Sequence, residues 1–229
     1  MRIHSSLNKR GITLIELLVA LVMGAIVVGA IYRVFVAQTK AYTIQDQVVE
    51  VQQSIRSAME IILRDLRMAG YDGNQTPSRL LTAVTPGDSA ITIQYRINGV
   101  LNTKVISRNA PTSELMENLL LDGAQAPNYP AVLLGNVDAL TFTYGVDGTV
   151  GDPASQDGAI DDFNSDGKID DADFVRAATV IGGNLNVIAV RVALTASPTP
   201  VNPDIPKMVQ PRTLVSAITL RNLCLLKTN

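Results

Sequence analysis

An apolar run near the start of the chain dominates its hydrophobic pattern. The run covers residues 17–32 and lies between Glu16 and Arg33, with apolar side chains on every side of a helix. Its length is about the minimum that crosses a bilayer as a helix. Small residues within it, such as Gly24 and Gly29, permit close packing against other helices. The pattern therefore predicts a helix that lies among lipids or among other helices.

Helical periodicity continues past Arg33 and becomes amphipathic. Apolar residues recur at steps of three and four, which is the spacing of one helix face, while charged and polar residues fill the other face. The apolar positions are Ile44, Val48, Val51, Ile55, Met59, Ile62, Leu66 and Ala69. The first proline is Pro77, so the pattern predicts one helix from about Ile12 to about Ala69 that ends at Gly70. We expect the amphipathic half to rest on a folded domain.

Beyond Gly73 the hydrophobic pattern changes to the period of two that is typical of β-strands. In residues 90–97, for example, Ile91, Ile93 and Tyr95 alternate with polar neighbours. The predicted strands are residues 90–97, 103–108, 138–145, 186–195 and 214–221. Such alternation indicates an antiparallel sheet with one buried face, which would pack on the amphipathic half of the helix. The expected fold class is α+β: a long N-terminal α-helix, hydrophobic and then amphipathic, packed on an antiparallel β-sheet.

Two segments interrupt the alternation. Residues 197–211 are too rich in proline for a central strand, so we expect them to connect the last two strands. Residues 112–122, TSELMENLLLD, predict a short helix capped by Thr112 or Ser113.

Composition argues against several classes of function. The 229 residues carry a formal net charge of −2 with scattered Lys and Arg, so no nucleic-acid partner is indicated. The only histidine, His4, lies upstream of Gly11, and the only cysteine is Cys224, so a histidine general base beyond Gly11 and a cysteine metal site are excluded. The sequence has no nucleophile elbow and no phosphate-binding loop. We therefore expect a structural or binding protein, not an enzyme.

The segment before the apolar run has the features of a processing signal. Its first ten residues carry only basic charges, a bias that keeps a segment on the cytoplasmic side of a membrane. Gly11 ends this segment, and ITLIELLVAL follows with Glu16 at its fifth position. The arrangement resembles the class III signal of type IV pilins and type II secretion pseudopilins. The resemblance implies a pilin-like fold. It also implies that a prepilin peptidase cuts the chain after Gly11 and methylates the new N-terminal residue, Ile12.

The same resemblance implies a role for Glu16. A carboxylate inside an apolar helix bundle is costly unless it meets a positive charge. In type IV pilins that charge is the N-terminal amine of another subunit, so Glu16 is expected to neutralise the amine of an Ile12 and to set the register between packed helices. The alternative is an ordinary N-terminal membrane anchor in which Glu16 lies at the interface.

The string LRDLRMAGYDG, residues 63–73, narrows the resemblance. The sequence at this helix end is similar to that of minor pilins of the PilW type. J-type pseudopilins of type II secretion carry a similar segment. A plain helix end with a glycine cap explains Gly70 but not the whole string. The implied function is a minor pilin that takes part in initiating a type IV pilus or lies at its tip. The alternatives are a J-type minor pseudopilin and a calcium-dependent adhesion or binding module displayed on a pilus.

A second motif, DFNSDGKIDDAD at residues 162–173, fits the twelve-residue calcium-binding loop. Alternate side chains supply the several oxygens that a hard cation requires, and Gly167 stands at the sharp turn. The loop resembles that of dockerins, with aspartate at its last position. The predicted ligands are Asp162, Asn164, Asp166, the backbone carbonyl of Lys168, Asp170 and Asp173. A structural Ca²⁺ is therefore the expected cofactor.

Two other interpretations of the acidic region remain open. The Asp and Gly residues alone can form a turn in which the side chains bond to local backbone groups. Upstream, residues 146–162 repeat the Asp-Gly pair and supply either extra ligands, from Asp157 or Asp161, or a solvated hairpin.

These expectations divide the chain into four parts. Residues 1–11 are the leader, residues 12–37 the hydrophobic transmembrane or filament-core helix, and residues 38–73 the amphipathic half of the helix. Residues 74–229 form a β-rich domain in the periplasm or outside the cell. The expected partners are the prepilin peptidase, other pilins that pack through the N-terminal helix, and a tip adhesin. The protein is expected in the bacterial inner membrane before assembly, and in the pilus, on the cell surface or in the periplasm afterwards.

Overall fold

A computed structural model describes residues 12–73, 83–149, 156–198 and 210–224. The chain divides into two compact units, Met1–Asp46 and Gln47–Asn229, which are treated separately below. Both units contain part of the first helix, α1, which runs without interruption over Leu14–Arg67. The predicted single helix is therefore confirmed.

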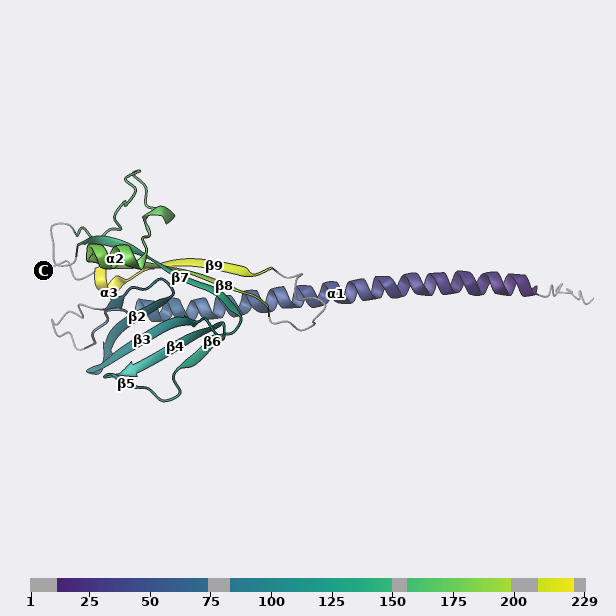
Figure 1. Ribbon diagram of the computed structural model, residues 1–229, viewed down its shortest axis with the longest axis horizontal. Coiled ribbons are helices and arrows are strands. Elements are labelled where there is room, and N and C mark those ends of the chain that lie inside the picture. Colours follow the sequence, from purple (N-terminus) through teal and green to yellow (C-terminus); the bar gives the residue numbers. More distant parts are fainter. Residues whose placement is uncertain (1–11, 74–82, 150–155, 199–209, 225–229) are drawn as a thin grey trace, which may run out of the picture. The chain divides into compact units, whose positions relative to one another are not determined.

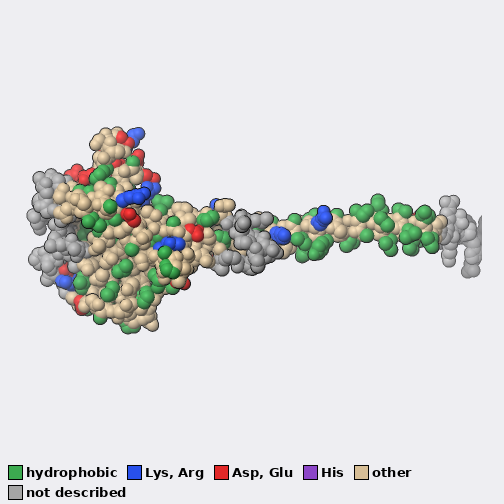
Figure 2. Space-filling view, in the orientation of Figure 1, with side chains coloured by type: hydrophobic (Ala, Val, Ile, Leu, Met, Phe, Trp, Pro, Cys, Tyr) green, Lys and Arg blue, Asp and Glu red, His purple; other side chains and the backbone are tan. Residues whose placement is uncertain are grey.

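The first unit consists, in its described part, of the apolar half of α1. Thr13 precedes the helix, and its hydroxyl accepts a hydrogen bond from the backbone N–H of Glu16 at 3.4 Å, which caps the first turn. Hydrophobic side chains cover this part of the helix and are exposed (Figure 2). By length and composition α1 can cross a membrane.

In the second unit one face of α1 is buried. Its buried apolar side chains are Val51, Ile55, Ala58, Met59, Ile62 and Leu66. After the helix ends at Arg67, Gly70 takes a left-handed backbone conformation with φ of 75°. This backbone conformation favours glycine, and a Cβ atom here would also make the end of the Leu223 side chain move, since it would approach it to 2.5 Å. The helix stop predicted at Gly70 is confirmed.

The first sheet is antiparallel throughout and contains six strands (Figure 1). Its strands are β1 (Val84–Thr85), β2 (Ala90–Ile97), β3 (Val100–Asn109), β4 (Glu114–Leu121), β5 (Ala124–Gln125) and β6 (Ala131–Leu134). They pair in the order β1-β2-β3-β4-β5, and β6 also pairs with β4. The predicted strands at 90–97 and 103–108 are confirmed as β2 and part of β3.

The helix predicted at residues 112–122 is wrong, because the segment forms strand β4. Residues 114–121 pair with residues 102–109 of β3 in one unbroken register. Ser113 has a positive φ of 53° and turns the chain back into this pairing. Leu and Glu are good helix formers, but intrinsic propensity is a small energy that ladder pairing and the burial of Leu115 outweigh.

The second sheet has three antiparallel strands: β7 (Val137–Thr149), β8 (Leu185–Ala196) and β9 (Arg212–Thr219), in the order β7-β8-β9. The strands predicted at 138–145, 186–195 and 214–221 are thus present, although the chain leaves β9 at Thr219 and forms a short helix, α3 (Arg221–Cys224). A 3-10 turn (Asp171–Asp173) and helix α2 (Ala177–Gly183) stand between β7 and β8. Within the predicted proline-rich connector, residues 199–209 lie outside the described residues.

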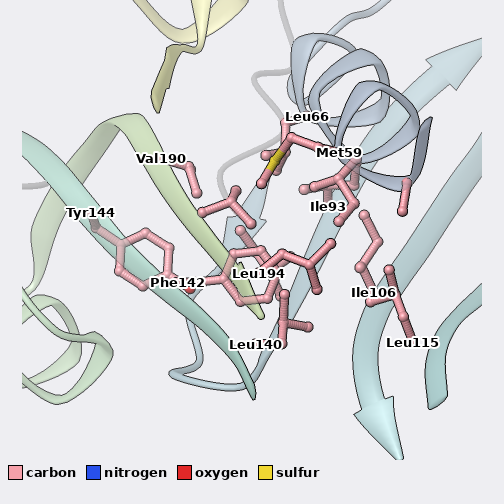
Figure 3. Close-up of a cluster of buried hydrophobic side chains, with 14 of the residues drawn as sticks. Met59, Leu66, Ile93, Ile106, Leu115, Leu140, Phe142, Tyr144, Val190 and Leu194 are labelled. Carbon is pink, nitrogen blue, oxygen red and sulfur yellow. The ribbon is translucent and has the colours of Figure 1, made fainter. Parts of the chain in front are cut away.

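The two sheets and the amphipathic half of α1 share one hydrophobic core (Figure 3). Met59 and Leu66 come from α1, and the first sheet supplies Ile93, Ile106 and Leu115. The second sheet contributes Leu140, Phe142, Tyr144, Val190 and Leu194. The sequence predicted one sheet on the helix, and the structure has two.

Tyr144 ties the second sheet to the turn before β2. Its buried hydroxyl accepts a hydrogen bond from the Gly87 N–H at 2.8 Å and donates one to the Gly87 carbonyl at 2.7 Å. Burial raises the pKa of the Tyr144 phenol, so it stays protonated and able to donate.

We expect Tyr144→Phe to lower the free energy of unfolding by about 1–3 kcal/mol, because both Gly87 groups lose their partner. Chemical denaturation followed by circular dichroism measures this, with Tyr71→Phe, at an exposed tyrosine, as the control; equal stabilities of the two variants would contradict it.

Candidate functional site

The start of α1 holds the predicted processing and assembly residues. Ile12 is 76% exposed, and Glu16 lies exposed in the first helical turn. Among the described residues no ion pair involves Glu16. Gly11 lies outside the described residues. Glu16 is thus available to a positive group from another molecule.

The acidic loop at residues 162–173 is folded by its own side chains. The Asp162 carboxylate accepts hydrogen bonds from the N–H groups of Asp166 at 3.2 Å and Gly167 at 2.6 Å. The Asn164 side-chain oxygen accepts from the N–H of Asp166 at 3.0 Å. Asp166 in turn accepts from the Lys168 N–H at 2.8 Å. Gly167 has φ of 79°, so the glycine stands where the turn requires it.

Asp173 closes this loop from its far end. One carboxylate oxygen accepts from the Phe163 N–H at 2.9 Å, and the other accepts from the Asp170 N–H at 2.8 Å. Asp173 is fully buried. Hydrogen bonds from the N–H groups of Asp170, Phe163 and Asn164 lower the pKa of Asp173, so the carboxylate stays ionised despite burial.

One ion pair anchors the loop to the second sheet. The Arg191 guanidinium on β8 lies 2.5 Å from the Asp171 carboxylate. Upstream, Asp161 accepts a hydrogen bond from the Gly148 N–H at 2.8 Å, and Asp157 accepts one from the Ala159 N–H at 2.8 Å. The two upstream aspartates therefore bond to local backbone groups.

The loop contains the residue types that bind Ca²⁺. In this structure their side chains accept hydrogen bonds from backbone N–H groups. The predicted ligands Asp162, Asn164 and Asp166 all accept N–H groups of their own loop. Within the described ranges, no three His, Cys, Asp or Glu side chains are grouped so that they could hold a metal ion. A carboxylate oxygen that accepts one N–H keeps a free lone pair, so these hydrogen bonds do not by themselves exclude a cation. Calcium binding stays a prediction.

A buried triad of charges, Asp65–Lys104–Glu117, was not predicted from the sequence. The Lys104 amine lies 3.0 Å from one Asp65 carboxylate oxygen and also contacts the Glu117 carboxylate. The three side chains are 6–8% exposed. Asp65 belongs to the end of α1, Lys104 to β3 and Glu117 to β4, so the triad joins the helix to the first sheet.

The sequence does carry a signal for the triad. Each of its residues lies at the spacing from buried apolar residues that places it on the same face of its helix or strand. Asp65 follows Ile62 by three positions and precedes Ala69 by four, which is a core position of the helical stripe. Lys104 lies two residues before Ile106 in β3, and Glu117 two residues after Leu115 in β4, so each shares a face with a buried apolar neighbour.

Burial and ion pairing shift the pKa values of Asp65 and Lys104 in opposite directions. Burial raises the pKa of Asp65, although the hydrogen bond and charge of Lys104 act to lower it. Burial alone would lower the pKa of Lys104, but hydrogen bonds to Glu117 and Asp65 outweigh it and raise the pKa. The triad carries two acidic groups for one base, so full ionisation leaves an excess negative charge in the core.

Comparison with known proteins bears on the N-terminal segment. Residues 6–32 match the family model of the prokaryotic N-terminal methylation motif, which confirms the predicted class III signal. Among solved structures, the type IV-like pilin TTHA1219 from Thermus thermophilus is similar at 13% identity and a TM-score of 0.46, over 75% of this chain and 97% of that chain. The comparison with curated protein sequences finds no match.

Proposed function

We propose that this chain, a type IV pilin-like protein with the prepilin methylation motif, is a minor pilin that takes part in initiating a type IV pilus or lies at its tip. One observation carries the proposal: the motif at residues 6–32 runs directly into α1, which continues to Arg67. Cleavage after Gly11 therefore leaves the apolar helix joined to the domain that follows. A secretory signal would instead be removed together with its apolar segment.

The exposed apolar half of α1 serves two successive environments in this proposal. Before assembly it anchors the protein in the inner membrane, as its length and composition permit. After processing by the prepilin peptidase it packs among the helices of other pilins. Glu16, exposed at the first turn, then pairs with the amine of an Ile12, because an unpaired carboxylate among apolar helices is costly.

The assignment as a minor subunit of the PilW type is supported by the string at residues 63–73. Three of its residues have structural roles in the second unit: Asp65 lies in the buried triad, Leu66 lies in the core, and Gly70 ends the helix in a left-handed conformation. The string therefore describes how α1 ends against the sheets. J-type pseudopilins carry a similar segment, so a minor pseudopilin of a type II secretion system is the second candidate.

Mass spectrometry of filaments sheared from cells tests the proposal. We expect an N-terminal peptide that begins at methylated Ile12, found in surface fibres together with a more abundant pilin. A deletion strain should make few fibres and should keep its type II secretion. Processed protein confined to membranes, with secretion lost and fibres still made in the deletion strain, would overturn the pilus assignment in favour of the pseudopilus.

We also propose that the loop at residues 162–173 binds a structural Ca²⁺ through the residues predicted above. The support is the ligand spacing, the turn at Gly167 and the anchor between Asp171 and Arg191, which holds one end of the loop on β8. A calcium-dependent adhesive role for the domain would rest on this site, because ordered loops are common binding surfaces.

Calcium should raise the thermal stability of the full chain in detergent. For a single site, free Ca²⁺ at about 100 times Kd stabilises the folded state by about 2.7 kcal/mol. Asp162→Ala should abolish the shift in melting temperature and the protection of residues 150–175 from proteolysis. The control Glu60→Gln removes an exposed carboxylate of α1 and should keep the full response. Equal melting and equal proteolysis with Ca²⁺ and with a chelator would argue for a metal-free turn.

A further inference from the structure

The buried triad brings an amine against two carboxyl groups in a nearly dry environment. Lys104 Nζ lies 3.0 Å from Asp65 Oδ2 and contacts Glu117, and all three side chains are at most 8% exposed. They lie on the buried faces of α1, β3 and β4. An amine and a carboxylic acid held in contact are the two reactants of amide formation, and their fixed proximity removes most of the entropic barrier.

We propose that Lys104 and Asp65 become joined by an intramolecular isopeptide bond, with Glu117 as the proton carrier. The bond would link the end of α1 covalently to β3. Nothing in the proposal depends on the function proposed above, since it rests only on the contacts within the second unit.

The reaction is a condensation that needs no oxidant and no cofactor. The Lys104 ammonium, whose pKa is raised by its two acidic partners, must first give up a proton, and the Glu117 carboxylate that it contacts accepts it. The lone pair of the neutral amine then forms a bond to Asp65 Cγ, and the electrons of the C=O bond move to oxygen. When the carbonyl re-forms, the Asp65 hydroxyl takes the proton from Glu117 and leaves as water. The nitrogen returns its extra proton to Glu117, which ends as a neutral acid beside a neutral amide.

Asp65 is taken as the acceptor because, among the ion pairs of the described residues, it faces a guanidinium as well as the Lys104 amine. Burial raises its pKa, which favours the neutral acid that an amine can attack. The Arg64 guanidinium lies 3.7 Å from the other Asp65 oxygen, where negative charge develops during the attack. Arg64 is 70% exposed, so its help is modest.

The product also removes an electrostatic cost. The ion triad holds two acids and one base in the core, whereas the product holds an amide and one neutral acid. A cross-link between Asp65 and Lys104 further restricts the unfolded chain, as a disulfide does. Both effects favour the bonded form once folding has aligned the reactants.

Intact mass spectrometry of the purified full chain in detergent tests the proposal. We expect the chain to be lighter by one water than its sequence requires. The comparison is made against Lys104→Arg, which keeps the charge but lacks the reactive amine, and against Lys40→Arg, whose side chain is exposed. Lys40→Arg should retain the loss of water and Lys104→Arg should not. Glu117→Gln should also lack it, because the proton carrier is gone.

Peptide mapping of the unmodified chain removes any dependence on how the variants fold. Trypsin should fail to cut after Lys104 and should release residues 65–67 joined to residues 97–108. A chain of full mass, with normal cleavage after Lys104, would overturn the proposal. Joining of residues 97–108 to residues 109–168 would overturn it as well, since the acceptor would then be Glu117.

Discussion

Replacing Lys104 with methionine should lower the free energy of unfolding by about 3–5 kcal/mol, because it leaves Asp65 and Glu117 buried without their basic partner and also prevents the proposed cross-link. Asp65 and Glu117 are both at most 8% exposed, so water cannot replace the lost charge. Methionine has nearly the length of the lysine stem, so little packing is lost. Chemical denaturation followed by circular dichroism is the suitable measurement, since the chain has no tryptophan.

The control and a combined variant separate the causes of this loss. Lys168→Met changes an exposed lysine and should alter stability by no more than about 0.5 kcal/mol. Adding Asp65→Asn and Glu117→Gln to Lys104→Met removes the stranded charges and should recover part of the lost stability. A Lys104→Met chain as stable as the Lys168→Met chain would show that the triad contributes nothing.

Glu16→Ala should lower incorporation of the subunit into filaments by about a hundredfold to a few thousandfold, provided that Glu16 pairs with the amine of an Ile12 as proposed. Losing one partner of a buried ion pair costs about 3–5 kcal/mol, and each 1.4 kcal/mol is about tenfold in an equilibrium. The measurement is the ratio of subunit in sheared fibres to subunit in membranes, with the mature N-terminus checked by mass spectrometry.

A matched variant distinguishes this role from a general effect of charge. Glu50→Ala removes an exposed carboxylate from the amphipathic half of α1 and should leave incorporation unchanged. If the Glu16→Ala subunit were processed normally and entered fibres as well as the parent chain, Glu16 would have no part in assembly. Loss of incorporation together with normal processing is the expected result.

Elements with a strong local pattern could be predicted from the sequence. Helix α1 and the strands at residues 90–97, 103–108, 138–145 and 186–195 each follow one clear period, and each is present. The methylation motif is equally local, since it depends on a basic leader, a glycine and an apolar helix with Glu16. The turn chemistry of residues 162–173 is also set by near neighbours, because its aspartates bond to N–H groups a few residues away.

What the tertiary structure decided depends on residues far apart in the chain. Residues 112–122 read as a helix locally but pair with β3, because a ladder along Val100–Asn109 offers more than weak helix propensity. The division into two sheets follows from how β7 pairs with β8 instead of with the first sheet. Asp65, Lys104 and Glu117 are residue types of the surface, although their phase in the sequence is that of buried positions. Only the packing of α1 on β3 and β4 buries them together. In the low dielectric of the interior, their interactions become much stronger than those of surface charges.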